Sequence, residues 1–140
     1  MATKLSQKRH TKRTPICKAI LLCDQVIRDE ATHKSSVIGI FDTALVASFP
    51  GPTPPCKIFL LLAGGLGSYS ITAEVHDPKL GVVLFRSPAV GEIGAPEKPA
   101  QGELWLPVAA LMFERPGAYE MVVFADGVEI ARTPFRVKTQ

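Results

Sequence analysis

Apolar and polar residues alternate along much of the chain in short segments, and turn-forming residues separate these segments. The clearest segment is 69–76 (YSITAEVH), in which every second residue is apolar. A period of two is typical of a half-buried antiparallel strand. The sequence DPKLG at 77–81 then predicts a turn, and 82–85 is the expected hairpin partner of the first segment.

Further apolar segments predict a series of short strands. They cover residues 16–27, 36–49, 57–63, 103–107, 118–124 and 128–137. Asp126-Gly127, between the last two segments, is a strong hairpin signal, whereas Gly39 inside the second segment favours a bend or a bulge. Segment 18–28 contains no helix breaker, so a helix is the alternative there, and 108–113 could form a single helical turn.

Particular residues in these segments give three further expectations. On a regular first strand, Cys17 and Cys23 share a face. Trp105 and Tyr119 are expected in the core as large anchors. The segment PGPTPP at 50–55 is expected to be an exposed loop, because proline lacks a backbone N–H and also restricts the residue before it.

Seven or eight short strands joined by turns, without a long helix, predict an all-β domain. The expected architecture is an antiparallel β-sandwich of immunoglobulin-like type, and a small β-barrel is the alternative. Residues 1–14 lack apolar periodicity and are expected to form a flexible basic arm, which leaves 15–140 as a single domain. A domain of this size can bury a core without disulfides or metals.

Several short motifs follow one another along nearly the whole chain. They are Cys23-Asp24 with Val26 and Asp29, Ile38-Gly39-Ile40-Phe41-Asp42, Phe49-Pro50, Phe113, Pro116-Gly117, Tyr119, Asp126-Gly127 and Pro134-Phe135. In this combination the chain resembles a family of bacterial proteins known as a domain of unknown function. The resemblance implies a β-sandwich, and it brings no activity, cofactor or catalytic residue with it.

The cysteines and the start of the chain bear on the cellular compartment. Cys17, Cys23 and Cys56 are an odd number of cysteines, which does not fit a secreted disulfide framework. The basic and polar first residues show no export signal, and the longest apolar runs are too short to cross a bilayer. We therefore expect a cytoplasmic protein with reduced thiols, without a cofactor and without a membrane partner.

Positive charge is concentrated at the start of the chain. The formal net charge is +3, but six Lys or Arg residues and no acid precede residue 19, so the other ten basic residues face thirteen acids. Lysines and arginines near the start could neutralise the phosphates of nucleic acid or contact an acidic protein surface. The residues concerned are Lys4, Lys8, Arg9, Lys12 and Arg13. A solubilising arm is the alternative, and it is favoured because no aromatic residue lies between these charges to stack on bases.

Acidic residues near the ends of the first two expected strands are the candidate metal ligands. If these strands pair, Asp24 and Asp42 come close together, and with Asp29 they could offer oxygen ligands to a hard cation such as calcium. The favoured alternative is that they are turn residues that cap the loop at 28–35. No cysteine has a histidine placed beside it by the sequence, so a nucleophilic thiol is not indicated.

These features favour a non-enzymatic β-sandwich module that binds a protein partner. Sheet edges and the proline-rich segments 50–55 and 87–100 are the expected contact surfaces, and a homo-oligomer formed through sheet edges is also plausible. One alternative is a nucleic-acid-associated protein that uses the basic arm. The other is a small metal-binding or hydrolytic enzyme that uses the acidic residues.

Overall fold

The chain forms β-strands throughout the part that the computed structural model describes, which is residues 13–87, 91–93 and 102–140. Seven strands make up the first half of the chain: β1 (Ile16–Cys23), β2 (Gln25–Arg28), β3 (Ser35–Ile38), β4 (Thr43–Val46), β5 (Gly51–Pro52), β6 (Cys56–Ala63) and β7 (Tyr69–Asp77). Six follow: β8 (Val82–Arg86), β9 (Gly91–Ile93), β10 (Gly102–Val108), β11 (Met112–Phe113), β12 (Gly117–Ala125) and β13 (Val128–Thr139). These described residues contain no helix that could span a membrane.

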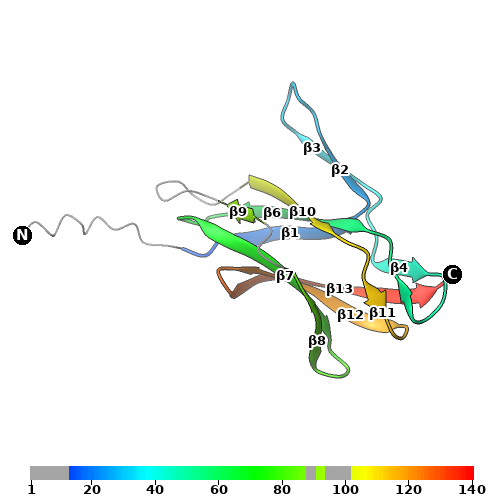
Figure 1. Cartoon of the computed structure of the whole chain (residues 1–140). Helices are drawn as coiled ribbons and strands as arrows, with labels where there is room; N and C mark the ends of the chain where they lie inside the picture. The colour runs from blue at the N-terminus through cyan, green and yellow to red at the C-terminus, as the bar shows by residue number, and fades with distance from the viewer. Residues whose placement is uncertain (1–12, 88–90, 94–101) are drawn as a thin grey trace, which may run out of the picture.

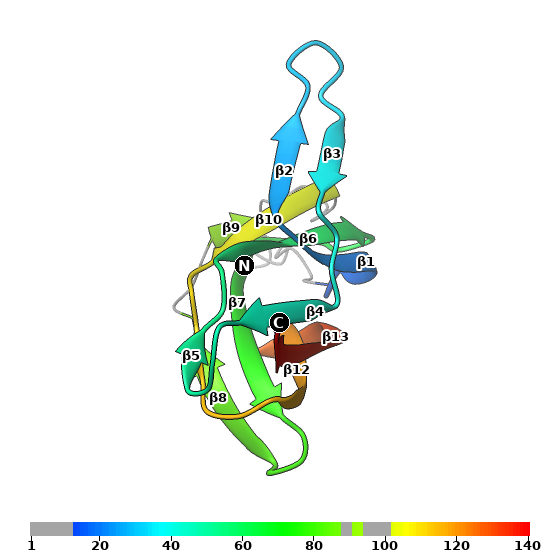
Figure 2. The same ribbon diagram turned by 90° about the vertical axis from the view of Figure 1, so that its right-hand side faces the viewer.

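Two sheets of unequal size pack face to face. The smaller sheet has three strands in the order β1-β6-β10, and the larger has six, in the order β4-β13-β12-β7-β8 with β9 also paired to β7. Figures 1 and 2 show the two sheets as separate layers, with the small sheet above and the large sheet below. Neither sheet closes on itself, so the predicted β-sandwich is confirmed and the alternative barrel is not formed.

The alternation in β7 positions the core. Tyr69, Ile71, Ala73 and Val75 are buried, as the period of two predicts, and the residues between them are half-buried on the outer face. The β12–β13 hairpin is also confirmed, with its turn at Asp126-Gly127. Asp126 and Gly127 have φ values of 50° and 81°, as the twist of a two-residue hairpin turn requires.

Aromatic side chains fill one end of the core. Phe113 packs edge-on against Tyr119 with ring centroids 4.8 Å apart, and Phe135 lies against both. The hydroxyl of Tyr119 donates a hydrogen bond of 2.6 Å to the carbonyl of Arg115, so its one polar atom is satisfied inside the protein. The expectation that Tyr119 anchors the core is therefore confirmed.

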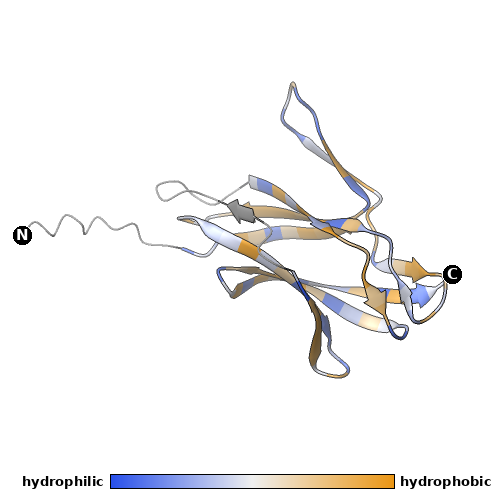
Figure 3. Ribbon diagram, in the orientation of Figure 1, coloured by the Kyte–Doolittle hydropathy of each residue, from blue (hydrophilic) through white to orange (hydrophobic). Residues whose placement is uncertain are grey.

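Trp105 does not lie in the core, so that prediction was wrong. On β10 it pairs with Phe59 of β6, which in turn pairs with Leu21 of β1, and this row faces away from the large sheet. Leu106, the next residue, is the one that points into the core and is buried. Trp105 is half-buried on the outer face of the small sheet. The strands of this sheet are apolar along most of their length (Figure 3), so both of its faces are apolar and no signal separated the two residues.

Cys17 and Cys23 lie on opposite faces of the small sheet rather than on one face. A bulge at Lys18 shifts the register, because Cys17 pairs with Leu62 while Ala19 pairs with Leu61. One inserted residue reverses the faces of a strand. Cys17 therefore packs against the core, and Cys23 lies on the outer side.

The segment at 50–55 is not simply an exposed loop. Gly51 and Pro52 form β5, which pairs with β11, and Thr53 is buried. Although proline cannot donate, the amides beside it can, and the Thr53 amide donates to the carbonyl of Leu111 at 2.9 Å. The partner segment at 108–113 is consequently extended and forms no helical turn.

The expected strands at 16–27 and 36–49 are each interrupted, at Asp24 and at Gly39. The halves nearest the turn, β2 and β3, pair with each other as a hairpin that projects from the small sheet (Figures 1 and 2). Gly39 has a φ of 72°, which confirms the bend expected there. After this bend the chain passes to the large sheet, where β4 pairs in parallel with β13.

Candidate functional site

One side of the sandwich is formed by edge strands of both sheets: β10 of the small sheet, and β8 and β9 of the large sheet, which pair with the same edge of β7. In the described chain β10 pairs only with β6, and β8 pairs only with β7. We call the side between β10 and β8 the open flank. It exists because a sheet of three strands cannot cover the whole inner face of a sheet of six.

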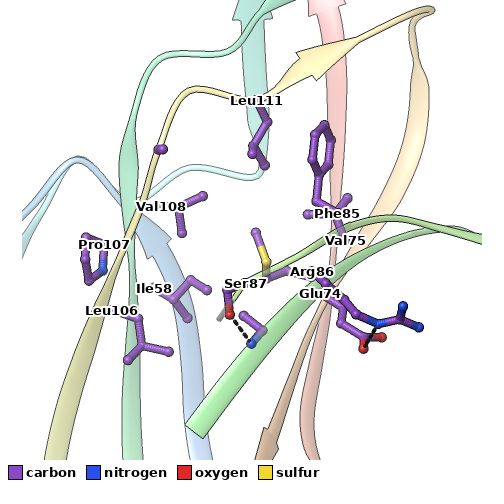
Figure 4. A pocket seen from close by; sticks show the side chains of 13 residues that line it. Ile58, Glu74, Val75, Phe85, Arg86, Ser87, Leu106, Pro107, Val108 and Leu111 are labelled. Atoms are coloured by element: carbon purple, nitrogen blue, oxygen red, sulfur yellow. Dashed lines mark hydrogen bonds and ion pairs between the residues drawn. The ribbon is translucent and has the colours of Figure 1, made fainter. Parts of the chain in front are cut away.

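A cavity of about 370 Å³ lies between the sheets at the open flank. We call it the flank cavity, and Figure 4 shows the side chains that surround it. Its walls come from both sheets and from the connection between β10 and β11: Ile58, Ala73, Glu74, Val75, Phe85, Arg86, Ser87, Leu106, Pro107, Val108, Ala109, Leu111 and Met121. Most of these side chains are apolar, and the volume is in the range of sites that hold ligand groups.

Backbone and hydroxyl groups of Ala73 and Ser87, two residues of the wall, bond to each other. The Ala73 amide donates to the Ser87 hydroxyl oxygen at 2.8 Å, and the Ser87 amide donates to the Ala73 carbonyl at 2.8 Å (Figure 4). Ser87 therefore bonds to β7 in the place of a further residue of β8, directly after β8 ends at Arg86. Because these groups are paired, the flank cavity offers apolar surface and few free hydrogen-bonding groups.

The ionisable groups beside the flank cavity form a small cluster of ion pairs. Glu74 accepts a hydrogen bond of 2.7 Å from His76 and one of 2.9 Å from the Nε of Arg86. The hydrogen bond to His76, and then that to Arg86, lowers the pKa of Glu74 below its ordinary value. Glu74 and Arg86 are therefore charged and mutually paired near neutral pH, an arrangement that suits a polar rim.

A second hollow, of about 220 Å³, lies next to the flank cavity and shares Phe85 with it. Large apolar side chains around the second hollow and on β8 are between 38% and 61% exposed: Leu80, Val82, Leu84 and Met112. Exposed apolar surface of this kind marks interaction sites in soluble proteins. The open flank therefore combines two hollows with a rim of exposed apolar residues.

The edge strands β8 and β10 differ in regularity. In β8, Val83 pairs with His76 and Phe85 with Val75, so Leu84 is bulged out of the ladder. A bulge of this kind twists an edge away from further pairing. By contrast, β10 pairs with β6 from Gly102 to Val108 without a shift in register. Of the two, β10 is the more regular edge for an added strand, and Pro107 is its one position without a backbone N–H.

The three candidate metal ligands do not form a site. The carboxylate of Asp29 accepts hydrogen bonds of 2.8 Å from the amides of Ala31 and Thr32 at the hairpin turn, and the bond from Thr32 contributes most to the lowered pKa of Asp29. Asp42 accepts from the hydroxyl of Thr43, and Asp24 packs against Gly39. Among the described residues, no three His, Cys, Asp or Glu side chains gather to hold a metal ion.

The basic residues near the start of the chain are described only from Arg13 onward. Lys4, Lys8, Arg9 and Lys12 lie outside the described residues. Arg13 and Leu66 exchange backbone hydrogen bonds of 2.9 and 2.8 Å, so the expected arm is already attached to the fold at Arg13. Its role in binding nucleic acid stays a prediction.

The cysteines are poor nucleophiles in this fold. Burial raises the pKa of the Cys56 thiol to about 11, and it also raises the pKa of Cys17 and of Cys23. The thiolate is the reactive form of cysteine. These side chains therefore act as small apolar groups within the sheets.

Sequence reasoning did not find the flank cavity. It named sheet edges in general, and it named segments 50–55 and 87–100 as contact surfaces. The first of these segments contains β5, and most of the second lies outside the described residues. The strongest available signal was the apolar run at 104–108. A strand that is apolar on both faces needs other residues to cover each face.

The model of a family of unknown function, DUF6941, matches residues 18–138. No curated protein matches the chain.

Proposed function

The chain belongs to DUF6941, a family of unknown function, and we propose from the geometry of the open flank that it is a strand-accepting interaction module. In this proposal an extended segment of a partner protein pairs with the edge of β10. Apolar side chains of that segment enter the flank cavity. The protein acts by binding, and it catalyses no reaction.

The observation that carries the proposal is the flank cavity directly beside a regular edge that has no strand neighbour among the described residues. When a strand joins a sheet, backbone hydrogen bonds supply affinity, and pockets for alternate side chains supply specificity. Here β10 supplies the edge, and Leu106 and Val108 of β10 line the cavity of about 370 Å³. One added strand would satisfy the edge and fill the cavity together.

The order of the strands supports the same position for the partner. We propose that the sandwich is of immunoglobulin-like type. In the seven-strand form of this fold, one sheet has four strands and the other has three. The hydrogen bond from Tyr119 to the Arg115 carbonyl supports this, since such sandwiches carry a tyrosine with the same contact at this corner. The described small sheet has three strands, and a fourth would lie beside β10.

The polar groups of the site support binding rather than catalysis. Glu74 and Arg86 bond to each other at the rim, and the Ser87 hydroxyl oxygen accepts from the Ala73 amide. A catalytic acid or base needs a position within reach of a substrate and a pKa suited to proton transfer. The lowered pKa of Glu74 keeps it ionised near neutral pH, which suits a rim ion pair.

The test is selection of displayed random peptides on the full-length protein, followed by titration of selected peptides. Val108→Glu places a charge in the cavity wall, and Val128→Glu is the matched control at a turn where Val128 is 52% exposed. We expect Val108→Glu to weaken binding by about tenfold or more, since an unpaired charge in an apolar site is costly, and Val128→Glu to leave it unchanged. Circular dichroism confirms that both variants are folded.

Hydrogen exchange locates the bound peptide independently of any substitution. We expect slower exchange at the amides of β10 when a selected peptide is bound, because an added strand covers that edge. The proposal is wrong if no peptide is selected, or if selected peptides protect other strands and bind Val108→Glu as well as the natural protein.

A further inference from the structure

We propose that the partner segment carries two apolar side chains two residues apart and an arginine next to one of them. This inference rests on the strand-accepting function proposed above. It specifies which chemistry the open flank recognises.

The inner face of β10 determines the two apolar positions. Leu106 and Val108 lie on the cavity side, two residues apart, and Leu106 is buried in the core. In a strand paired with β10, the residues opposite these two would also point inward, with about 7 Å between them along the strand. The partner therefore presents two inward side chains to one cavity.

The volume of the flank cavity matches two side chains better than one. A cavity of about 150 Å³ in another protein is large enough to bind benzene. The flank cavity, at about 370 Å³, is more than twice that size. Leucine, isoleucine, valine or phenylalanine at both inward positions would fill it, whereas alanine at either position would leave part of it empty.

The outer face of β10 determines the third position. Trp105 is half-buried there, and Glu103 is exposed on the same face two residues earlier. Ser35 of the β2–β3 hairpin donates a hydrogen bond to the Glu103 carboxylate, which holds this acid above β10. A partner residue opposite Trp105 would lie beside the indole ring and diagonally across from Glu103.

Arginine fits this outer position by charge and by shape. A guanidinium group stacks on an indole ring and is attracted by its π-electrons. It would also be attracted by the carboxylate of Glu103, whereas an acidic residue at the same position would be repelled. The residue opposite Leu106 is the neighbour of the residue opposite Trp105, so the arginine directly adjoins an apolar position.

The recognised segment thus reads arginine, apolar, any residue, apolar, in one of the two chain directions. The structure is compatible with parallel or antiparallel addition at β10, so both directions are tested. A small apolar molecule would fill the cavity as well. It would show no preference connected with Glu103.

The experiment uses four capped peptides with threonine at the remaining positions. One has the pattern arginine–leucine–threonine–leucine and one has the reverse order, and each has a partner in which glutamate replaces arginine. Fluorescence polarisation gives their dissociation constants for the full-length protein and for Glu103→Gln. Glu129→Gln, which removes an exposed acid on β13, is the matched control.

We expect one of the two directions to bind, with glutamate in place of arginine weakening it by about tenfold. Glu103→Gln should reduce this preference to about threefold or less, and Glu129→Gln should leave it unchanged. Alanine in place of either leucine, tested in two further peptides, should weaken binding by about tenfold.

The outcomes separate this inference from the proposed function. If peptides selected from the random library bind at β10 but arginine and glutamate bind equally, the inference is wrong and strand acceptance stands. The same conclusion follows if the preference is unchanged in Glu103→Gln. If neither the designed peptides nor any library peptide binds at β10, both proposals are wrong.

Discussion

The two flanks of the sandwich are lined by similar apolar side chains, but the connecting main chain meets them differently. On the β10 side, the connection from β10 to β11 forms part of the wall of the flank cavity, and on the β1 side residues 41 and 42 bond to both sheets. On the β1 side, the Phe41 amide donates to the Leu22 carbonyl at 3.0 Å, and the Arg136 amide donates to the Asp42 carbonyl at 2.8 Å. Residues 41 and 42 thereby connect the small sheet to the large one. We call this side the closed flank.

On the open flank the same two sheets end in the edge strands β10 and β8, with the flank cavity between them. The comparison is close because Leu22 of β1 and Leu106 of β10 both pair with Ile58 of β6 and are both buried. Ile58 therefore has a buried leucine on each side. The difference is that backbone hydrogen-bonded to both sheets lies beside Leu22, whereas beside Leu106 the connection from β10 to β11 leaves the flank cavity.

Truncating the two leucines gives the largest expected effect and tests this comparison directly. Leu22→Ala should lower the free energy of unfolding by about 3–4 kcal/mol. Leu22 lines a hollow of about 330 Å³, but it is buried beside backbone that is hydrogen-bonded to both sheets and has little freedom to relax into the space left by the truncated side chain. Leu106→Ala should cost about 2–3 kcal/mol, because the apolar flank cavity beside Leu106 gives neighbouring side chains room to relax into the space left by the truncated side chain. Urea denaturation of both variants measures the difference.

The comparison would be wrong if Leu106→Ala were as costly as Leu22→Ala or more so. Equal denaturant slopes in the two variants are the necessary control, since a change in slope indicates a change in the unfolded state.

The crossing segment of the closed flank begins at Gly39, and this glycine supplies the second test. Gly39 and Gly64 have nearly equal φ values, 72° and 75°. A Cβ at Gly39 would meet the side chain of Asp24, including its Cβ at 2.9 Å, whereas at Gly64 the nearest atom is the Ile16 Cδ1 at 3.7 Å. Gly64→Ala should cost about 1 kcal/mol for the left-handed backbone alone, and Gly39→Ala about 2 kcal/mol.

Thermal unfolding of the two glycine variants measures that difference. If both variants lost the same stability, the contact with Asp24 would have no energetic role at the base of the hairpin.

Lengthening a side chain should have opposite effects on the two flanks. Val46 of β4 is buried beside the closed flank, so Val46→Ile overpacks it and should cost about 1 kcal/mol. Val108 borders the flank cavity, so Val108→Ile adds buried apolar surface and should gain about 0.5 kcal/mol. Chemical denaturation gives both values, and a loss of stability in Val108→Ile would show that the cavity wall has no room.

Whether a strand is apolar on one face or on both explains which elements the sequence could predict. Alternation in 69–76 and the Asp126-Gly127 turn predicted β7 and the β12–β13 hairpin because one face of each is buried and the turn needs positive φ. Trp105 was misplaced because β10 is apolar on both faces. The bulge at Lys18 had no signal in composition, since the register depends on the partner strand β6.

The candidate site could not be predicted from the sequence, for a related reason. The flank cavity is formed by residues from Ile58 to Met121, and its existence depends on how many strands each sheet has. Local patterns report burial and turns, but not which edges are left without a neighbour. The acidic residues were correctly seen as turn residues in one case, since Asp29 caps the hairpin turn.

The smallest expected effect concerns the rim of the open flank and its dependence on pH. The hydrogen bonds from His76 and Arg86 lower the pKa of Glu74 in the folded protein. Ionised Glu74 therefore stabilises the fold above the unfolded-state pKa of about 4.3, and this contribution is lost as the pH falls through the lower, folded-state pKa. Glu74→Gln should be less stable than the natural protein near neutral pH by a few tenths of a kcal/mol, because ion pairs near the surface contribute about that much.

The difference between Glu74→Gln and the natural protein should disappear once both are studied below the folded-state pKa. Glu129→Gln is the control: binding to Arg132 lowers the pKa of Glu129 in the same direction, but its side chain is 42% exposed, against 17% for Glu74. Solvent screening should make the control effect smaller still. Urea denaturation across the acid range measures both variants. A stability gap for Glu74→Gln that persisted in acid would mean that Glu74 acts through packing against the open flank and not through its charge.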